Sequence, residues 1–292
     1  MLDAPEVAAV TLTARSVCAC VACRFGHGAR TGTRSTHRYT SDPTDAEWAV
    51  ICARMAWPSW LDGNGGRPEE YCRREIVDAI FYVADNGIKW RKLPADFPPW
   101  RTVYACFARW WAGEVLALHG DLRDQVRVAA DRDIGPSAGI IDSQSLRAAE
   151  TVGAATRGYD AGKNVNGRQR HLVVDTLGLL LVVVVTAASV QDRDGARLTL
   201  TRLRDWFDKT SLIWADTAYA GKLVTWANTA VGLAIQVMRR PADTHQFVVL
   251  PRRRVVERTL AWITCRRRCV RDYERLPTPH EAMGLGHDHG DE

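Results

Sequence analysis

The sequence lacks an apolar run long enough to cross a membrane. Its longest, from Leu177 to Val185, contains a glycine and falls well short of the roughly 20 residues that a transmembrane helix needs. Residues 1–37 lack the charged start, apolar block and cleavage site of a secretory signal. No internal repeat at a solenoid period is present. We therefore expect a globular cytoplasmic protein.

The cysteines do not have the density of a disulfide scaffold. Eight are spread over 292 residues, mostly in apolar or helical contexts, which is typical of a reducing compartment. Cys18, Cys20, Cys23 and His27 have the residue types of metal ligands. Their short C-x-C-x2-C spacing is not followed by a second pair, so zinc is not expected there.

The composition otherwise allows one large domain or two smaller ones. Apolar residues make up 46% of the chain and charged residues 25%, enough for a packed core. The net charge of +5 is unevenly placed, because the segment 238–275 has eleven arginines and four acids. This local excess of +7 favours a polyanion that meets one face of the molecule. The alternative is a solvated basic helix.

The order of apolar patterns predicts a helical region followed by a mixed sheet. Helices are expected from the cap Thr44, from Pro68 to Asn86-Gly87 and from Thr102. Five apolar runs then predict strands, three of them consecutive, with helices at 196–207, 221–228 and 252–270. The strand runs are Gly139–Asp142, His171–Asp175, Leu179–Ala187, Ser211–Asp216 and Leu233–Met238. This order is the ribonuclease H-like α/β arrangement, in which the first and fourth strands are parallel neighbours.

Three acidic residues occupy positions that suit metal-assisted phosphoryl transfer. Asp142 and Asp216 each end an apolar run, and Glu257 lies in an arginine-rich helical stretch. Carboxylates at the ends of neighbouring buried strands are poorly solvated and need a cation, and Mg²⁺ or Mn²⁺, as two ions, would suit them. Each acid also has an alternative structural role. Asp142 would be a strand-end turn residue, Asp216 a helix N-cap, and Glu257 an i,i+4 ion-pair partner of Arg253.

Basic residues near these acids are candidate contacts to nucleic acid. They lie in the polar loop between the first two expected strands and along the last expected helix. They are Arg157, Lys163, Arg168, Arg170, Arg253, Arg254, Arg258, Arg267, Arg268 and Arg271. Contacts of this kind would give salt-sensitive affinity that is independent of base sequence.

Several long motifs resemble the bacterial insertion-sequence-five family of DDE transposases. They are DPTDAEWAVICARM, REIVDAIFYVADNGIKWRKLPADFPPWRTVYACFARWWAGEVL, IIDSQSLRAAE, RGYDAGKNVNGRQRHLVVDTLGLLLVVVVTAASVQDRDGA, WADTAYAG and RRRVVERTLAWITCRRRCVRDYERLP. The resemblance implies a transposase that binds terminal inverted repeats, cleaves DNA with Mg²⁺ and joins the 3′ ends to a target. It also implies the catalytic triad Asp142, Asp216 and Glu257, DNA as partner, homo-oligomeric action on two element ends, and association with the nucleoid.

The resemblance divides the chain into four parts. Residues 1–37 are expected to be a disordered extension, and 38–135 a helical DNA-binding region. Residues 136–276 would form the ribonuclease H-like DDE catalytic domain, and 277–292 an atypical tail, truncated or frameshifted.

The chain departs from the family pattern at several positions. Thr186 replaces a usual histidine, Ser189 an acid and Cys265 an arginine. Two other functions therefore stay open. One is a non-catalytic DNA-binding copy that inhibits transposition, and the other a ribonuclease H-like nuclease acting on hybrids or junctions.

Overall fold

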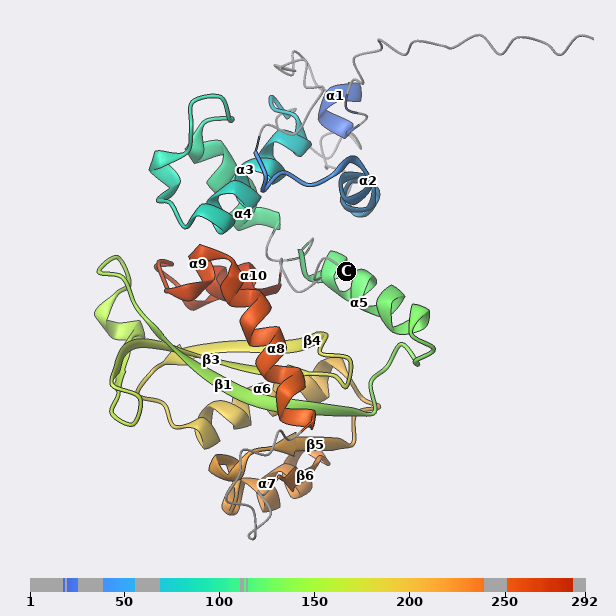
Figure 1. The fold of residues 1–292 in the computed structure, drawn as a ribbon, viewed down its shortest axis with the longest axis vertical. Coiled ribbons are helices and arrows are strands. Elements are labelled where there is room, and N and C mark those ends of the chain that lie inside the picture. The colour runs from blue at the N-terminus through green and yellow to red at the C-terminus, as the bar shows by residue number, and fades with distance from the viewer. Residues whose placement is uncertain are drawn as a thin grey trace, which may run out of the picture.

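The computed structural model describes residues 18, 20–25, 39–55, 69–110, 113, 115–238 and 251–285. Its first part is helical and its second part is a sheet with helices on both faces, as the sequence predicts (Figure 1). No helix in the described ranges is long and apolar enough to cross a membrane.

The helical part contains helices at the three predicted places and others that the sequence analysis did not indicate. Its elements are α1 (Val21–Phe25), α2 (Asp45–Arg54), α3 (Arg73–Asn86), η1 (Trp90–Lys92), α4 (Trp100–Trp110) and α5 (Leu116–Ala129). The side chain of Thr44 accepts a hydrogen bond from the backbone N–H of Glu47, and the Glu47 carboxylate accepts one from the backbone N–H of Thr44, which completes the predicted capping box of α2. Gly87 ends α3 in the left-handed conformation with φ 65°, which a glycine adopts without strain.

The structure describes residues 18 and 20–25 of the expected extension 1–37. Cys20 and Ala22 are 1% and 0% exposed and belong to the same apolar cluster as Trp48 and Cys72. The first described segment is therefore packed on the helical part. The remaining residues of 1–37 lie outside the described residues.

The sheet has six strands, because a short strand joins the five expected ones. They are β1 (Ala138–Arg147), β2 (Gly158–Asp160), β3 (Val165–Val174), β4 (Leu180–Ala187), β5 (Leu212–Ala215) and β6 (Ala234–Val237). Their order is β2-β3-β1-β5-β6, with β4 also paired to β3. β1 and β5 are parallel neighbours, which confirms the prediction for the first and fourth strands.

The strands β1 and β3 are longer than their apolar runs indicate. β1 continues five residues beyond Asp142 to Arg147, and each of these residues pairs with β3. Polar residues are accepted there because the ladder is made by backbone groups, whatever the side chains. Asp142 therefore lies inside β1, and the alternative of a strand-end turn residue does not apply to it.

Helices cover both faces of the sheet. Between the strands lie η3 (Ala154–Thr156), α6 (Asp192–Trp206), η4 (Thr217–Tyr219) and α7 (Lys222–Val231). After the sheet come α8 (Pro251–Cys265), α9 (Arg267–Val270) and α10 (Pro277–Leu285). Figure 1 shows α8 crossing in front of the sheet, with α6 behind it. The helix predicted for residues 252–270 is interrupted at Arg266, which has an extended backbone.

Alternation along the strands sends neighbouring side chains to opposite faces. Ile140 and Leu172 join the cluster on the face of Val256 in α8, whereas Ile141 and Val173 join the cluster that contains Leu200 of α6. Of the expected atypical tail, residues 277–285 form α10, with Ala282 and Met283 buried, and the rest lies outside the described residues.

Candidate active site

Asp142 lies where the parallel pairing of β1 and β5 ends. Ala138, Gly139 and Ile140 pair with Leu212, Ile213 and Trp214, and continuing this register places Asp142 opposite Asp216. Residues two apart share a face, so Asp142 lies on the face of Ile140 and Asp216 on the face of Trp214. Both faces are the one that α8 covers. The sheet therefore brings the two acids together beneath α8.

The carboxyl group of Asp142 is poorly compensated by the protein. Burial raises its pKa from 3.8 to about 6, and the neighbouring charge of Asp216 adds to this effect. A hydrogen bond of 2.8 Å from the backbone of Ser143, and the charges of Arg253 and Lys163, only partly oppose the rise in pKa. A half-buried carboxylate of this kind gains from a bound cation.

This raised pKa predicts a pH-dependent stability. In buffer without added divalent ions, the contribution of Asp142 to the free energy of unfolding should fall by roughly 1–3 kcal/mol as the pH rises from about 4 to about 6, because the native state holds the Asp142 proton longer than the unfolded chain does. Other groups, such as His171 with its lowered pKa, contribute in the opposite direction, so denaturant titrations should show this fall as a pH-dependent difference between the native chain and Asp142→Asn. The exposed Asp205→Asn should follow the native chain. Identical profiles for the native chain and Asp142→Asn would contradict the assignment.

Asp216 follows β5 and caps the helix η4. Its Oδ1 accepts a hydrogen bond of 2.8 Å from the backbone N–H of Ala218. The N-cap role that the sequence offered as an alternative is therefore present. That bond engages Oδ1 and leaves Oδ2 with no hydrogen bond in the described structure.

Glu257 lies on the exposed side of α8. Its Oε1 is 2.9 Å from Nε of Arg253, so the predicted i,i+4 ion pair is present, with 55% and 44% of the two side chains exposed. Arg253 in turn lies close enough to lower the pKa of Asp142. Arg252 stacks on Trp214 with its guanidinium 3.7 Å from the ring centroid. These contacts place the beginning of α8 over the ends of β1 and β5.

Asp142 and Asp216 lie close enough for their charges to affect each other, whereas Glu257 is linked to them through its ion pair with Arg253. Among the described residues, only four cysteines form a group of three or more His, Cys, Asp or Glu ligands within 4.8 Å of one another. The arrangement therefore consists of the adjacent pair Asp142 and Asp216, with Glu257 nearby on α8 and engaged by Arg253.

A second polar cluster supports β1 on the face of α6. Ser143 Oγ donates to Asp192 at 2.6 Å, and the amide of Gln169 donates to Ser143 at 3.0 Å and also to Asp192. Tyr219 is buried beside these groups. Burial, with the charges of Asp142 and Asp192, raises the pKa of Tyr219 well above 10. The sequence analysis did not select Ser143, Gln169, Asp192 or Tyr219, although all four lie within the motifs quoted there.

His171 lies next to this cluster and contacts Thr186. Its Nε2 is 3.0 Å from the Thr186 hydroxyl, and burial lowers its pKa to about 4. A Cβ on Gly195 would lie 2.1 Å from the His171 ring, so α6 approaches the sheet closely at this point. Thr186, where the family pattern has a histidine, is thus a hydrogen-bond partner of the neutral His171.

Part of the predicted basic set faces solvent. Lys163 lies in the turn between β2 and β3, 44% exposed and 4.0 Å from Asp160. Besides Arg253, four other arginines of the predicted set are exposed: Arg254, Arg258, Arg267 and Arg271. Arg258 and Arg271 each donate to one backbone carbonyl, and Arg157 is half-buried.

Two other predicted DNA contacts are interior residues. Arg168 and Arg170 are 0% exposed, because their alternate positions in β3 face the C-terminal segment. Arg168 pairs with Asp272 at 2.8 Å and also donates to Thr156 and to backbone carbonyls. Arg170 donates to the carbonyl of Cys269 and contacts His280. Both arginines hold the C-terminal segment on the sheet and are not available to DNA in this structure.

Arg268 is also buried, at the junction of the two parts. Its Nε and Nη2 lie 2.8 and 2.6 Å from Oε1 of Glu274, and its Nη1 donates to the carbonyl of Ile88. The guanidinium also lies 5.3 Å from the ring centroid of Trp90. The predicted single helix over 252–270 ends before this residue, so Arg268 lies on α9 and not on α8 with Arg253. Its role here is to join the helical part to the sheet part.

The helical part and the sheet part of the chain each match a known protein family. Residues 133–276, which contain the sheet, α8 and α9, match the family "Transposase DDE domain". Residues 44–118, in the helical part, match the family "Putative transposase of IS4/5 family". The chain belongs to the IS4/IS5 family of DDE transposases. No curated protein matches this transposase.

Membership of this family agrees with the donor set beneath α8. Divalent ions such as Mg²⁺ bind carboxylate oxygens, and the half-buried Asp142 and the neighbouring Asp216 provide two such groups with incomplete compensation. The residues present in the transposase therefore fit a hard divalent cation.

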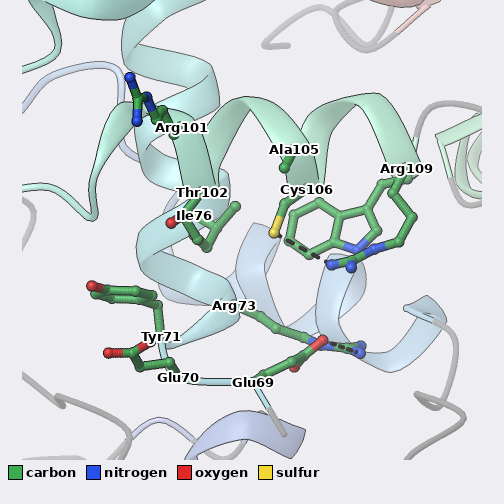
Figure 2. Close-up of a pocket in the computed structure, with 11 residues that line it drawn as sticks. Glu69, Glu70, Tyr71, Arg73, Ile76, Arg101, Thr102, Ala105, Cys106 and Arg109 are labelled. Atoms are coloured by element: carbon green, nitrogen blue, oxygen red, sulfur yellow. Dashed lines mark hydrogen bonds and ion pairs between the residues drawn. The ribbon is translucent and has the colours of Figure 1, made fainter. Parts of the chain in front are cut away.

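The helical part of the transposase contains a cleft of about 370 Å³ between α3 and α4. Figure 2 shows Glu69, which precedes α3, and Arg73, the first residue of α3, on one side of the cleft and Cys106 and Arg109 of α4 on the other. Arg73 is held by Glu69 at 2.8 Å and is buried, whereas Arg101 and Arg109 are exposed. Of these arginines, only Arg101 and Arg109 present charge to an external partner.

Proposed function

We propose that this transposase binds the terminal inverted repeats of its element, cleaves DNA there in a divalent-metal-dependent reaction and transfers the 3′ ends to a target. The observation that carries the proposal is the placement of Asp142, half-buried and with a raised pKa, opposite Asp216 at the end of the β1–β5 pair. A site of this kind suits a reaction whose charge lies on phosphate oxygens.

Asp142, Asp216 and Glu257 are the residues that would hold Mg²⁺ or Mn²⁺, as two ions. Bound there, such ions supply Lewis-acid stabilisation of phosphate oxygens and a more acidic water. Asp142 and Asp216 have their backbones fixed by the sheet and by the cap of η4. Their positions therefore require little reorganisation.

Glu257 can join this pair at low cost. Its ion pair with Arg253 is largely exposed on both sides, and exposed pairs of this kind contribute only about 0–1 kcal/mol. If a cation replaced Arg253 as the partner of Glu257, the guanidinium of Arg253 would be free to bind a phosphate oxygen. Arg253 would then hold the DNA beside the carboxylates, while the cluster of Ser143, Gln169 and Asp192 keeps β1 in place.

The DNA surface proposed here omits the buried arginines. It consists of Arg157, Lys163, Arg253, Arg254, Arg258, Arg267 and Arg271, with Arg101 and Arg109 of α4 as contacts of the helical part. Their charge is suited to phosphates and carries no base sequence information by itself. Action on two element ends would require at least two copies, so we also propose a homo-oligomer in the DNA complex.

Arg253→Ala should weaken DNA binding without unfolding the chain. Loss of one phosphate contact should lower the slope of log K against log salt by about 0.9. Arg197→Ala is the matched control, since Arg197 is exposed on α6, on the opposite face of the sheet. Fluorescence anisotropy at several salt concentrations measures both slopes. An unchanged slope for Arg253→Ala would remove Arg253 from the DNA surface.

The proposed reaction is tested with end-containing DNA, a target plasmid and Mg²⁺. The expected products are nicks at the element ends and, later, ends joined covalently to target DNA. Binding without nicking would instead indicate the non-catalytic copy. Cleavage of an RNA–DNA hybrid or a branched junction with no joined product would indicate the nuclease.

A further inference from the structure

Four cysteines that are distant in the sequence meet at the helical part. Cys18, Cys20 and Cys23 come from the first described segment, and Cys72 immediately precedes α3. Their four sulfur atoms all lie within 4.8 Å of one another. The Sγ atoms of Cys20 and Cys72, 52 residues apart, are 3.7 Å apart. Cys72 is the fourth ligand that the C-x-C-x2-C spacing lacks.

The sulfur separations match those of a single tetrahedral metal ion. Zinc–sulfur bonds of about 2.3 Å place two sulfurs of a tetrahedron about 3.8 Å apart. A disulfide would require about 2.05 Å between sulfurs, and all four cysteines are free. A tetrahedral set of four thiolates suits zinc or iron rather than magnesium or calcium.

The surroundings of the four sulfurs are those of a closed structural site. Cys20 and Cys72 are buried, at 1% and 5% exposure, and Cys18 and Cys23 are half-buried. The Cys20–Cys23 turn is closed by a backbone hydrogen bond of 3.0 Å, from Cys23 N–H to the Cys20 carbonyl. Buried cysteines also pack as small apolar groups, but that alone does not require four sulfurs at one point.

The local helix needs such an anchor. α1 has only five residues, and a helix of that length is unstable without tertiary contacts. In this structure Cys20 and Ala22 provide its buried contacts to the helical part. A metal ion bound to Cys18, Cys20, Cys23 and Cys72 would fix this segment to the beginning of α3.

We propose that Cys18, Cys20, Cys23 and Cys72 bind one Zn²⁺ ion as a structural site. Four thiolates fill the coordination sphere, so the ion has no open position for substrate and takes no part in cleavage. The ion joins the segment around α1 to the start of α3, next to the cleft shown in Figure 2. This site is separate from the proposed magnesium site.

Metal analysis of the full chain tests this proposal. After gel filtration in reducing buffer, elemental analysis should find about one zinc per chain, and Cys72→Ser should lose at least about nine-tenths of it. Cys265→Ser is the matched control, because Cys265 is exposed and lies outside the cluster. It should keep the zinc content of the native chain.

A second measurement uses the native chain and therefore does not require any variant to fold. The native chain, with its zinc replaced by Co²⁺, should show the visible absorption and thiolate charge-transfer bands of tetrahedral cobalt bound to sulfur. Absence of tightly held metal, with the cluster thiols reacting as fast as Cys265 or forming disulfides, would overturn the proposal. Iron in place of zinc in the purified chain would overturn the choice of zinc. Neither measurement involves DNA cleavage, so both are independent of the proposed function.

Discussion

Replacing Asp142 with asparagine is expected to lower Mg²⁺-dependent nicking of end-containing DNA by at least about 10³-fold, the scale seen when one member of a catalytic unit is removed. The asparagine keeps the size of the side chain and can still accept the hydrogen bond from Ser143. It removes the charge whose pKa burial raises to about 6. DNA affinity should change little, because Asp142 is not among the basic contacts.

The control for this experiment is Asp205→Asn, an exposed change on α6 that should leave nicking unchanged. Rates should be measured in single turnover at saturating protein, so that binding and chemistry are separated. If Asp142→Asn nicks as fast as the native chain, Asp142 does not belong to the reaction centre.

Arg268→Ala should destabilise the chain by about 3–5 kcal/mol, the usual cost of removing one partner of a buried ion pair. It would leave Glu274, 4% exposed, without its two contacts to the guanidinium. It would also remove the bond to the carbonyl of Ile88 and the contact with Trp90. Urea unfolding measures this difference.

Two further variants separate burial from charge at this position. Arg267→Ala, at the exposed neighbour, should change stability by no more than about 0.5 kcal/mol. Arg268→Met combined with Glu274→Met should recover much of the loss, since apolar replacement of a whole buried pair is often nearly neutral. A small effect of Arg268→Ala on stability, together with weaker DNA binding, would return Arg268 to the DNA surface.

The strands of the sheet could be predicted because each is marked by a local run of apolar residues in the sequence. Apolar runs located the five principal strands, and their order predicted the parallel contact of β1 and β5 that brings Asp142 to Asp216. Strand ends were less accurate. The polar residues from Ser143 to Arg147 give no apolar signal, although their backbone pairs with β3.

The roles of individual arginines could not be predicted from charge alone. Arg168 and Arg170 differ from exposed residues only through their partners Asp272 and Cys269, which are about 100 positions away. The cysteine cluster has the same origin, because Cys72 joins Cys20 only after the helical part has folded. Long-range partners decide in both cases whether a polar group is a surface contact or an interior one.

The most direct test of metal binding by Asp142, Asp216 and Glu257 is anomalous scattering from crystals of the chain with end DNA and Mn²⁺. We expect manganese density bounded by Asp142 and Asp216, with Glu257 turned from Arg253 toward the metal. Manganese found only elsewhere, with the Glu257–Arg253 pair intact and phosphate distant from Asp142, would contradict the proposed reaction centre.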